Sequence, residues 1–196
     1  MARYEPLRTI QLSPRNLFLR SQQLPEIVHL DDPAFAVMTD FAQAPPRMIS
    51  PHESMDGALN EMKVYGVHLL LVQETAGNIV GVIGSEDILG EQPIKIIQER
   101  RINRSQVTVK MLMSPLNKIA AFDMHTLEFA KVGHIVITLK KLRVHYALVI
   151  SNENGNDRQT LRAIFTTSQI SRQLHMDISD AIAKAQSLSE LQKRRL

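Results

Sequence analysis

An internal repeat with a single constant offset limits the folds open to this chain. The stretches VHLLLV (67–72) and VHYALV (144–149) are nearly the same, and His68 of the first corresponds to His145 of the second. Apolar residues also recur at helical spacing before each stretch, and counterparts are separated by the same distance along the chain as the two histidines: Met55, Ala58, Leu59, Met62 and Tyr65, then Val132, Ile135, Val136, Leu139 and Leu142. One offset that aligns an amphipathic helix and the strand after it predicts two units of the same structure.

The agreement extends past the repeated strand. In the first copy, turn residues precede a second apolar strand, Ile79–Ile83, and Ser85 is predicted to cap the next helix. If the turn of the second copy is five residues longer, AIFTTSQI (163–170) aligns with GVIGSEDI (81–88), and Thr167 takes the cap position of Ser85. Each unit is therefore predicted to be a helix, two strands and a second helix.

A short segment also precedes each unit. VMTDF (37–41) comes before the first helix and VKMLM (109–113) before the second copy of it. Pro45-Pro46 and Ser114-Pro115 interrupt the chain after these segments, and a short strand is predicted beyond each interruption.

Single residues indicate where other elements begin and end. Ser54 suits the start of the first helix and Gly66 its exit. Pro93 can begin a short helix between the units, and residues 1–33 are proline-interrupted and irregular. A last amphipathic helix is predicted from Asp177, with one apolar side: Ile178, Ile182, Ala185, Leu188 and Leu191.

Composition excludes several classes of function. The 196 residues include no cysteine, so there is no disulfide framework, thiolate nucleophile or cysteine metal site, and the histidines fall at no metal-ligand spacing. No P-loop, G-x-S-x-G or paired-carboxylate motif indicates an enzyme. No signal peptide or membrane-spanning run is seen, so we expect a cytoplasmic protein. The formal charge of +3 and an aromatic fraction of 5% without tryptophan argue against nucleic-acid binding.

Taken together, the ordered motifs resemble a tandem pair of CBS domains over residues 34–176. VMTDF and VKMLM resemble the lead segment of that family, VHLLLVQE and VHYALVIS its inner strand, and GVIGSEDI its closing signature. The resemblance implies an α+β fold, a pseudo-twofold tandem repeat of β-α-β-β-α units that share a cleft. The implied division is 1–33 irregular segment, 34–93 first CBS domain, 94–106 connecting helix, 107–176 second CBS domain, and 177–196 C-terminal helix and basic tail.

The resemblance also implies a ligand site between the units. In the family signature, a threonine and a helix start hold phosphate, and an aspartate accepts hydrogen bonds from the ribose hydroxyls, in keeping with general anion and diol chemistry. Each copy of this chain keeps part of the signature. The implied ligand-binding residues are Asp87, Ser85, Gly84 and His68 in the first copy and His145, Thr166, Thr167 and Gln169 in the second.

Two departures from the signature stand out. Gly84 occupies the threonine position of the first copy, and Gln169 replaces the aspartate in the second. The alternative interpretation makes Asp87 a helix-start residue that complements the helix dipole, and makes the two histidines half-buried residues bonded to backbone. No catalytic or metal-binding residue is predicted.

Three functions follow for testing. The first is a stand-alone regulatory module that binds AMP, ADP, ATP or S-adenosylmethionine, needs no cofactor, and signals in trans to an unknown protein partner. The second is a ligand-free CBS pair used for dimerisation or protein interaction. The third is a nucleic-acid-associated adaptor. A homodimer is expected, because a lone CBS pair exposes apolar helix faces that the family buries against a second pair.

Overall fold

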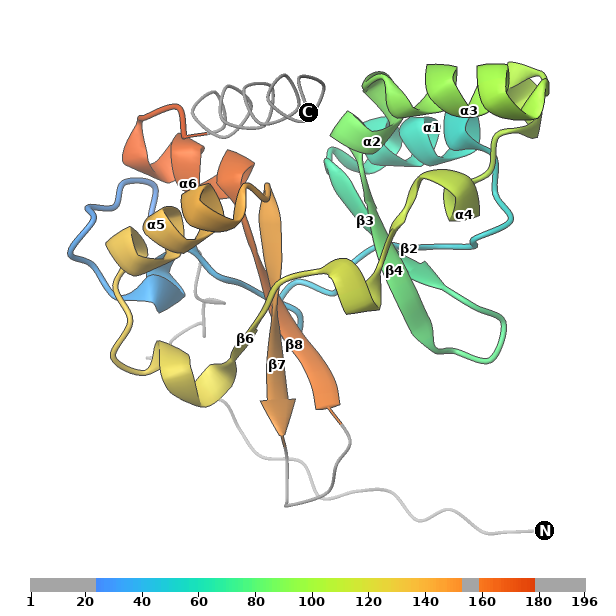
Figure 1. Cartoon of the computed structure of the whole chain (residues 1–196). Coiled ribbons are helices and arrows are strands. Elements are labelled where there is room, and N and C mark those ends of the chain that lie inside the picture. The colour runs from blue at the N-terminus through green and yellow to red at the C-terminus, as the bar shows by residue number, and fades with distance from the viewer. Residues whose placement is uncertain (1–23, 153–158, 179–196) are drawn as a thin grey trace, which may run out of the picture.

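Residues 24–152 and 159–178 are described by the computed structural model of this chain (Figure 1). They form two lobes, each built on a four-stranded sheet with helices packed on it. No helix of these residues is both long and apolar enough to cross a membrane.

The first sheet has the strand order β2-β3-β4-β5. Its central strands β3 and β4 are antiparallel, β2 lies parallel to β3, and β5 lies antiparallel to β4. The bounds are β2 Met48–Ile49, β3 Leu69–Gln73, β4 Ile79–Gly84 and β5 Ser114–Pro115. The helices of this lobe are α1 Met55–Tyr65, α2 Ser85–Leu89, α3 Gln92–Arg100 and α4 Val109–Leu112, followed in the chain by the 3-10 turn η3 Leu116–Lys118.

The second sheet has the order β1-β8-β7-β6, with the same pattern of parallel and antiparallel pairs. Its strands are β1 Thr39–Asp40, β6 Ala121–Asp123, β7 Tyr146–Asn152 and β8 Gln159–Thr166. Its helical elements are η1 Ala34–Val37, η4 Met124–Leu127, α5 Val132–Leu142 and α6 Thr167–Leu174.

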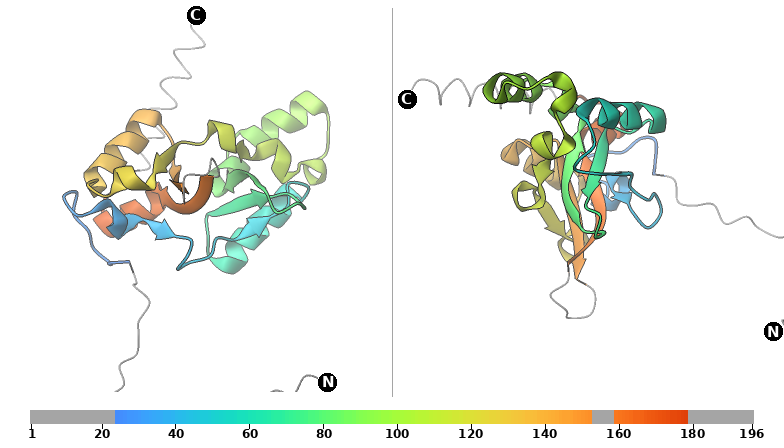
Figure 2. Two further views of the ribbon diagram at one scale, coloured as in Figure 1. Left: turned by 90° about the horizontal axis from the view of Figure 1, so that it is seen from below. Right: turned by 90° about the vertical axis from the view of Figure 1, so that its right-hand side faces the viewer.

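The segment before each unit is exchanged between the lobes. β1 precedes the first unit but pairs with β8, and β5 precedes the second unit's helix but pairs with β4. Buried Val37 joins the core of the second lobe, and buried Val109 joins that of the first. Figure 2 shows the two crossings, in light blue and in yellow-green. The exchange ties the lobes together through backbone hydrogen bonds as well as side-chain packing.

An apolar cluster lies between the sheets. Leu71 and Val82 of the first sheet are buried against Leu148 and Ile164 of the second, and Tyr146 packs at its edge. Each fully buried aliphatic side chain contributes roughly 1.5–3 kcal/mol relative to an exposed one. The repeated strands therefore hold the two units against each other.

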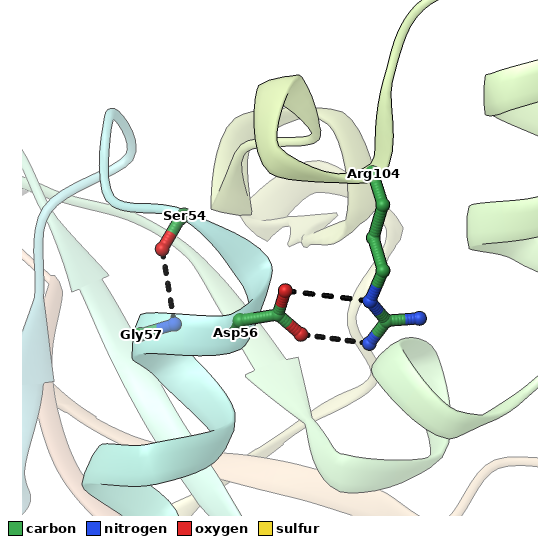
Figure 3. A network of polar contacts seen from close by, with 4 residues as sticks. All are labelled: Ser54, Asp56, Gly57 and Arg104. Carbon is green, nitrogen blue, oxygen red and sulfur yellow. Dashed lines mark hydrogen bonds and ion pairs between the residues drawn. The ribbon is translucent and has the colours of Figure 1, made fainter.

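The predicted repeat is confirmed element by element. The first helix begins after Ser54, whose side chain accepts a hydrogen bond from the backbone nitrogen of Gly57 at 3.0 Å. It ends at Gly66, which adopts the left-handed conformation with φ 64°. Figure 3 shows this N-terminus and the neighbouring ion pair between Asp56 and Arg104, in which the shortest N–O distance is 2.7 Å. That pair joins α1 to the connection between the units.

The short strands predicted beyond Pro45-Pro46 and Ser114-Pro115 are confirmed as β2 and β6. The lead segments before them differ from each other: only Thr39–Asp40 of 37–41 is extended, and 109–113 contains the helical turn α4, with the strand at Ser114–Pro115. Backbone bonds explain this, because the nitrogen of Met113 donates to the carbonyl of Val109 and closes a helical turn. A short segment with three or four apolar residues fits either structure.

The predicted N-caps of α2 and α6 are wrong by one residue. Ser85 and Thr167 are the first residues of α2 and α6, and the N-caps are Gly84 and Thr166. Of the predicted C-terminal helix, residues 179–196 lie outside the described part, as does the turn between β7 and β8, residues 153–158. Ile178, which is described, is 2% exposed and packs in the second core.

Candidate functional site

A hollow of about 170 Å³ lies where the two units meet. Asp87 reaches it from the start of α2 in the first unit. The segment between β5 and β6 forms a second side, and the residues at the start of β7 form the third. The lining residues are Asp87, Ser114, Lys118, Ile119, Ala120, Arg143, Val144, His145 and Tyr146. Two of the predicted site residues, Asp87 and His145, are thus brought together although they belong to different units.

Asp87 is held by the first turn of its own helix, α2. Its Oδ2 accepts a hydrogen bond from the backbone nitrogen of Gly84 at 2.8 Å. Its Oδ1 receives no hydrogen bond from the residues that the structure describes. Burial raises the pKa of this carboxyl, and the negative charge of Glu86 adds to the rise, while the Gly84 hydrogen bond and His145 oppose it. The carboxylate is therefore only partly compensated by the protein.

His145 lines the same hollow as Asp87 and has one ring nitrogen without a described partner. Its Nδ1 is buried and has no hydrogen-bond partner among the described residues. Its carbonyl accepts from the backbone nitrogen of Thr167 at 2.8 Å, as the carbonyl of His68 accepts from Ser85 at 2.9 Å. The two histidines thus occupy equivalent backbone positions, but His68 is not among the residues that line the hollow.

Tyr146 is a residue of the hollow that the sequence motifs did not reveal. Burial raises its pKa to about 12; a hydrogen bond with Ser114 lowers it, and the charges of Asp87 and Glu86 raise it. The phenol therefore stays neutral at physiological pH. Leu69 fills the corresponding position of the first unit, so the repeat alignment could have drawn attention to a polar residue at this place.

The start of α2 presents carboxylates, and two backbone N–H groups there are already bonded. The nitrogen of Gly84 is bonded to Asp87, and that of Ser85 to the carbonyl of His68. A side chain at position 84 would meet Glu86, whose Oε2 lies 2.9 Å from where a Cβ would stand. Backbone N–H groups at a helix start attract anions only while they are unbonded.

The corresponding residues of the second unit have other partners. Thr166 accepts from the nitrogen of Gln169 at 3.3 Å, as an ordinary N-cap. The Gln169 amide donates to Gln173 Oε1 at 2.8 Å, and its carbonyl oxygen accepts from Arg172. Thr167 is buried. Gln169 therefore faces a different hollow, under residues 24–27, and not one that Asp87 shares.

A larger hollow of the described residues lies elsewhere. It measures about 750 Å³ and lies between residues 24–25, the lead segment and Met124. Its one carboxylate, Asp40, is paired with Arg162 at 2.8 Å. The smaller hollow at Asp87 is the better candidate, because charged and polar groups from both units converge on it.

Comparison with known proteins identifies a domain in the first unit. Residues 34–93 match the family model described as the CBS domain. The chain contains a CBS domain in its first unit. No curated protein sequence matches it.

Solved structures share the fold of this CBS domain protein. One is an uncharacterized conserved protein from Pyrococcus horikoshii, with 18% identity over 73% of this chain and 92% of that chain and a TM-score of 0.51. Another is a conserved CBS domain protein of unknown function from Thermoplasma acidophilum, with 17% identity over 77% of this chain and 74% of that chain and a TM-score of 0.54. CBSX2 in complex with AMP has 18% identity over 72% of this chain and 94% of that chain, with a TM-score of 0.49. The first two likenesses establish the α+β arrangement of a tandem CBS pair.

Proposed function

We propose that this CBS domain protein is a regulatory module that binds an adenosine-type ligand in the hollow at Asp87. The observation that carries the proposal is the Asp87 carboxylate, which faces the hollow with one oxygen that no described residue engages. A carboxylate is a natural acceptor for two neighbouring hydroxyls such as those of ribose. A bound diol would supply the hydrogen bonds that the protein leaves unmade.

The other walls suit a nucleoside. Ile119, Ala120 and Val144 give the hollow an apolar side on which a base can lie. The buried Nδ1 of His145 is a polar group that a ligand can satisfy. Binding sites for small molecules commonly combine an apolar lining with a few convergent polar groups, as here.

The regulated partner would be reached in trans, and we propose that the working form is a homodimer. Exposed apolar side chains lie on or near the helices of the first lobe: Val64, Tyr65, Leu89 and Ile94. A second copy that covered them would remove this apolar surface from water. Light scattering at micromolar concentration should give the mass of two chains, and a monomer mass would contradict the dimer.

A thermal-shift screen with AMP, ADP, ATP and S-adenosylmethionine is the first experiment. A ligand that binds the folded state alone raises the melting temperature, by an amount that depends on its concentration relative to Kd. The test of Asp87 follows by calorimetry. Asp87→Asn should weaken the bound ligand about tenfold, since a lost charge-assisted hydrogen bond is worth on the order of 1.5–3 kcal/mol.

Asp87→Asn separates the loss of the charge from the loss of the helix cap. Asparagine keeps an oxygen that can accept from the Gly84 nitrogen, so the start of α2 can stay capped while the charge is lost. Unchanged affinity for a ligand that does bind would show that Asp87 does not hold the ribose. Gln169→Ala is the matched control in the second unit, and its affinity should equal that of the wild type.

The second candidate function is a ligand-free CBS pair that mediates dimerisation or protein interaction. The capping bond of Asp87 to Gly84 favours it, because that bond alone gives the residue a structural role. A screen without any thermal shift, together with a stable dimer, would support this function instead. Nucleic-acid binding stays predicted as weak or absent, and a gel shift at physiological salt checks it.

A further inference from the structure

The proposed ligand site leaves open which wall of the hollow receives negative charge. A ligand phosphate at the start of α2 would face the carboxylates of Glu86 and Asp87. Position 84 offers no hydroxyl, and the first two backbone nitrogens of this region are already bonded. Like charges a few ångströms apart repel, and α2 has only five residues to oppose them with its dipole. This wall therefore disfavours an anion.

The cations of the hollow lie on its other sides. Lys118 ends η3, on the segment between β5 and β6, and Arg143 lies between α5 and β7. Both side chains line the same hollow as Asp87, and both residues are exposed. A guanidinium and an ammonium together are a common way of binding a phosphate or carboxylate group.

Resting on the proposed function, we infer that the hollow takes an adenosine-type ligand that carries an anionic group, and that Lys118 and Arg143 bind this group instead of the start of α2. Asp87 and the two cations then bind different parts of one ligand. The carboxylate accepts from the hydroxyls, and the cations of the opposite walls bind the charge. The protein thereby distinguishes a nucleotide from the uncharged nucleoside.

The repeat indicates a substitution of Arg143 that the backbone can accept. This residue has φ 57°, and Gly66, its counterpart in the first unit at the end of α1, has φ 64°. Glycine adopts this left-handed conformation without steric cost, so Arg143→Gly removes the cation and does not strain the backbone. Lys118→Gln removes the other cation, and Lys110→Gln, at an exposed lysine on α4 outside the hollow, changes the net charge equally.

The experiment compares AMP with adenosine as probes by calorimetry on the full chain. The wild type should prefer AMP by at least about tenfold. Arg143→Gly and Lys118→Gln should each weaken AMP about tenfold and leave adenosine within about twofold, since each removes a charge-assisted contact to the anion alone. Lys110→Gln should match the wild type for both probes.

The outcomes separate this inference from the function on which it rests. Equal affinity for the two probes, or a preference for AMP that survives in both hollow variants, overturns the inference and leaves an adenosine site in place. Loss of adenosine binding together with AMP in these variants overturns it too, because the cations would then act on the nucleoside. Binding of neither probe, with no response to ADP, ATP or S-adenosylmethionine, overturns the proposed function and the inference together.

Discussion

Asp87 and Gln169 occupy the same position in the two units, two residues after the first residue of α2 and of α6, and their side chains differ in what they bind. Asp87 uses one oxygen to cap its own helix and turns toward a hollow shared with the second unit. Gln169 has its amide and its carbonyl oxygen bonded to Gln173 and Arg172 of its own helix. The repeat thus preserves the backbone position, whereas the availability of the side chain for a ligand depends on its neighbours.

The neighbours of Gln169 belong to a network that holds the segment before the first unit. Gln173 is 2% exposed, and its amide donates to the carbonyl oxygens of Pro25 at 2.6 Å and Ala36 at 3.0 Å. The backbone nitrogen of Val28 donates to the Gln173 carbonyl at 3.0 Å. The C-terminal part of α6 therefore holds residues 25–36 against the second lobe.

Among the variants that test this difference between the units, Gln173→Ala is expected to have the largest effect on stability. The substitution leaves two carbonyl oxygens and the Gln169 amide without their partner and opens space in a buried place, so the free energy of unfolding should fall by about 2 kcal/mol. Urea denaturation followed by circular dichroism measures the loss. Ligand affinity at Asp87 should stay unchanged.

Gln169→Ala is the control for this variant. Gln169 is half-buried and donates only one bond to Gln173, so its loss should be less than half as large. A Gln173 variant as stable as the wild type would mean that the network does not fasten the segment. A change in ligand affinity in either variant would mean that the second unit contributes to the site after all.

A smaller effect is expected at the helix cap of the second unit. Thr166 accepts from the nitrogen of Gln169, and loss of such a cap costs about 1 kcal/mol of stability. Thr166→Ala should therefore lower the melting temperature without weakening the ligand, and Ser54→Ala, which removes the side-chain cap of α1, should behave in the same way. Titration calorimetry should give one ligand per chain. Two equivalent sites, or weaker binding in Thr166→Ala, would place a phosphate at α6.

The sequence predicted the part of the fold that depends on local pattern. The constant offset of the repeat located α1 with α5 and β3 with β7, because helical spacing and an apolar strand are properties of neighbouring residues. It did not reveal that β1 pairs with β8 and β5 with β4. The side on which a two-residue strand pairs is decided by tertiary contacts, and no sequence period records it.

The site was predictable only where the family motif covers it. Asp87 and His145 were identified through the motif, and they do share the hollow. Lys118 and Arg143 were missed as site residues because they lie outside the motifs, and Tyr146 was missed because it stands in VHYALVIS at a position to which no ligand role was given. All three line the hollow with Asp87 only after the units pack together. Conversely, Thr166 matches the motif and Gln169 stands at its aspartate position, but both bond within their own helix. Sequence position identifies candidates, and the neighbouring side chains decide which of them can meet a ligand.

The smallest predicted effect concerns the charge of Asp87 itself and is read in the absence of ligand. Burial raises the pKa of this carboxyl in the folded state above its ordinary value. A raised acid pKa means that the fold favours the protonated form, so the stability linked to it is present below the unfolded pKa of about 3.9 and is lost as pH rises through the folded pKa. Asp87→Asn keeps an uncharged side chain at every pH. Its melting temperature relative to the wild type should therefore rise from pH 4 to pH 7, by less than the loss expected for Thr166→Ala.

The opposite pH dependence of the melting temperature would change the comparison between Asp87 and Thr166. If Asp87→Asn becomes the less stable protein as pH rises, the carboxylate stabilises the start of α2 more than its burial costs, through the cap at Gly84 and the helix dipole. Asp87 would then be a cap of its own helix, as Thr166 is in the second unit, and the two units would use this position alike. The wild type could instead be less stable than the variant at neutral pH and still bind the ligand about tenfold better. That result would show that the carboxylate charge serves ligand binding and lowers the stability of the fold. Melting curves of both proteins at pH 4, 5, 6 and 7, without ligand, decide between the two.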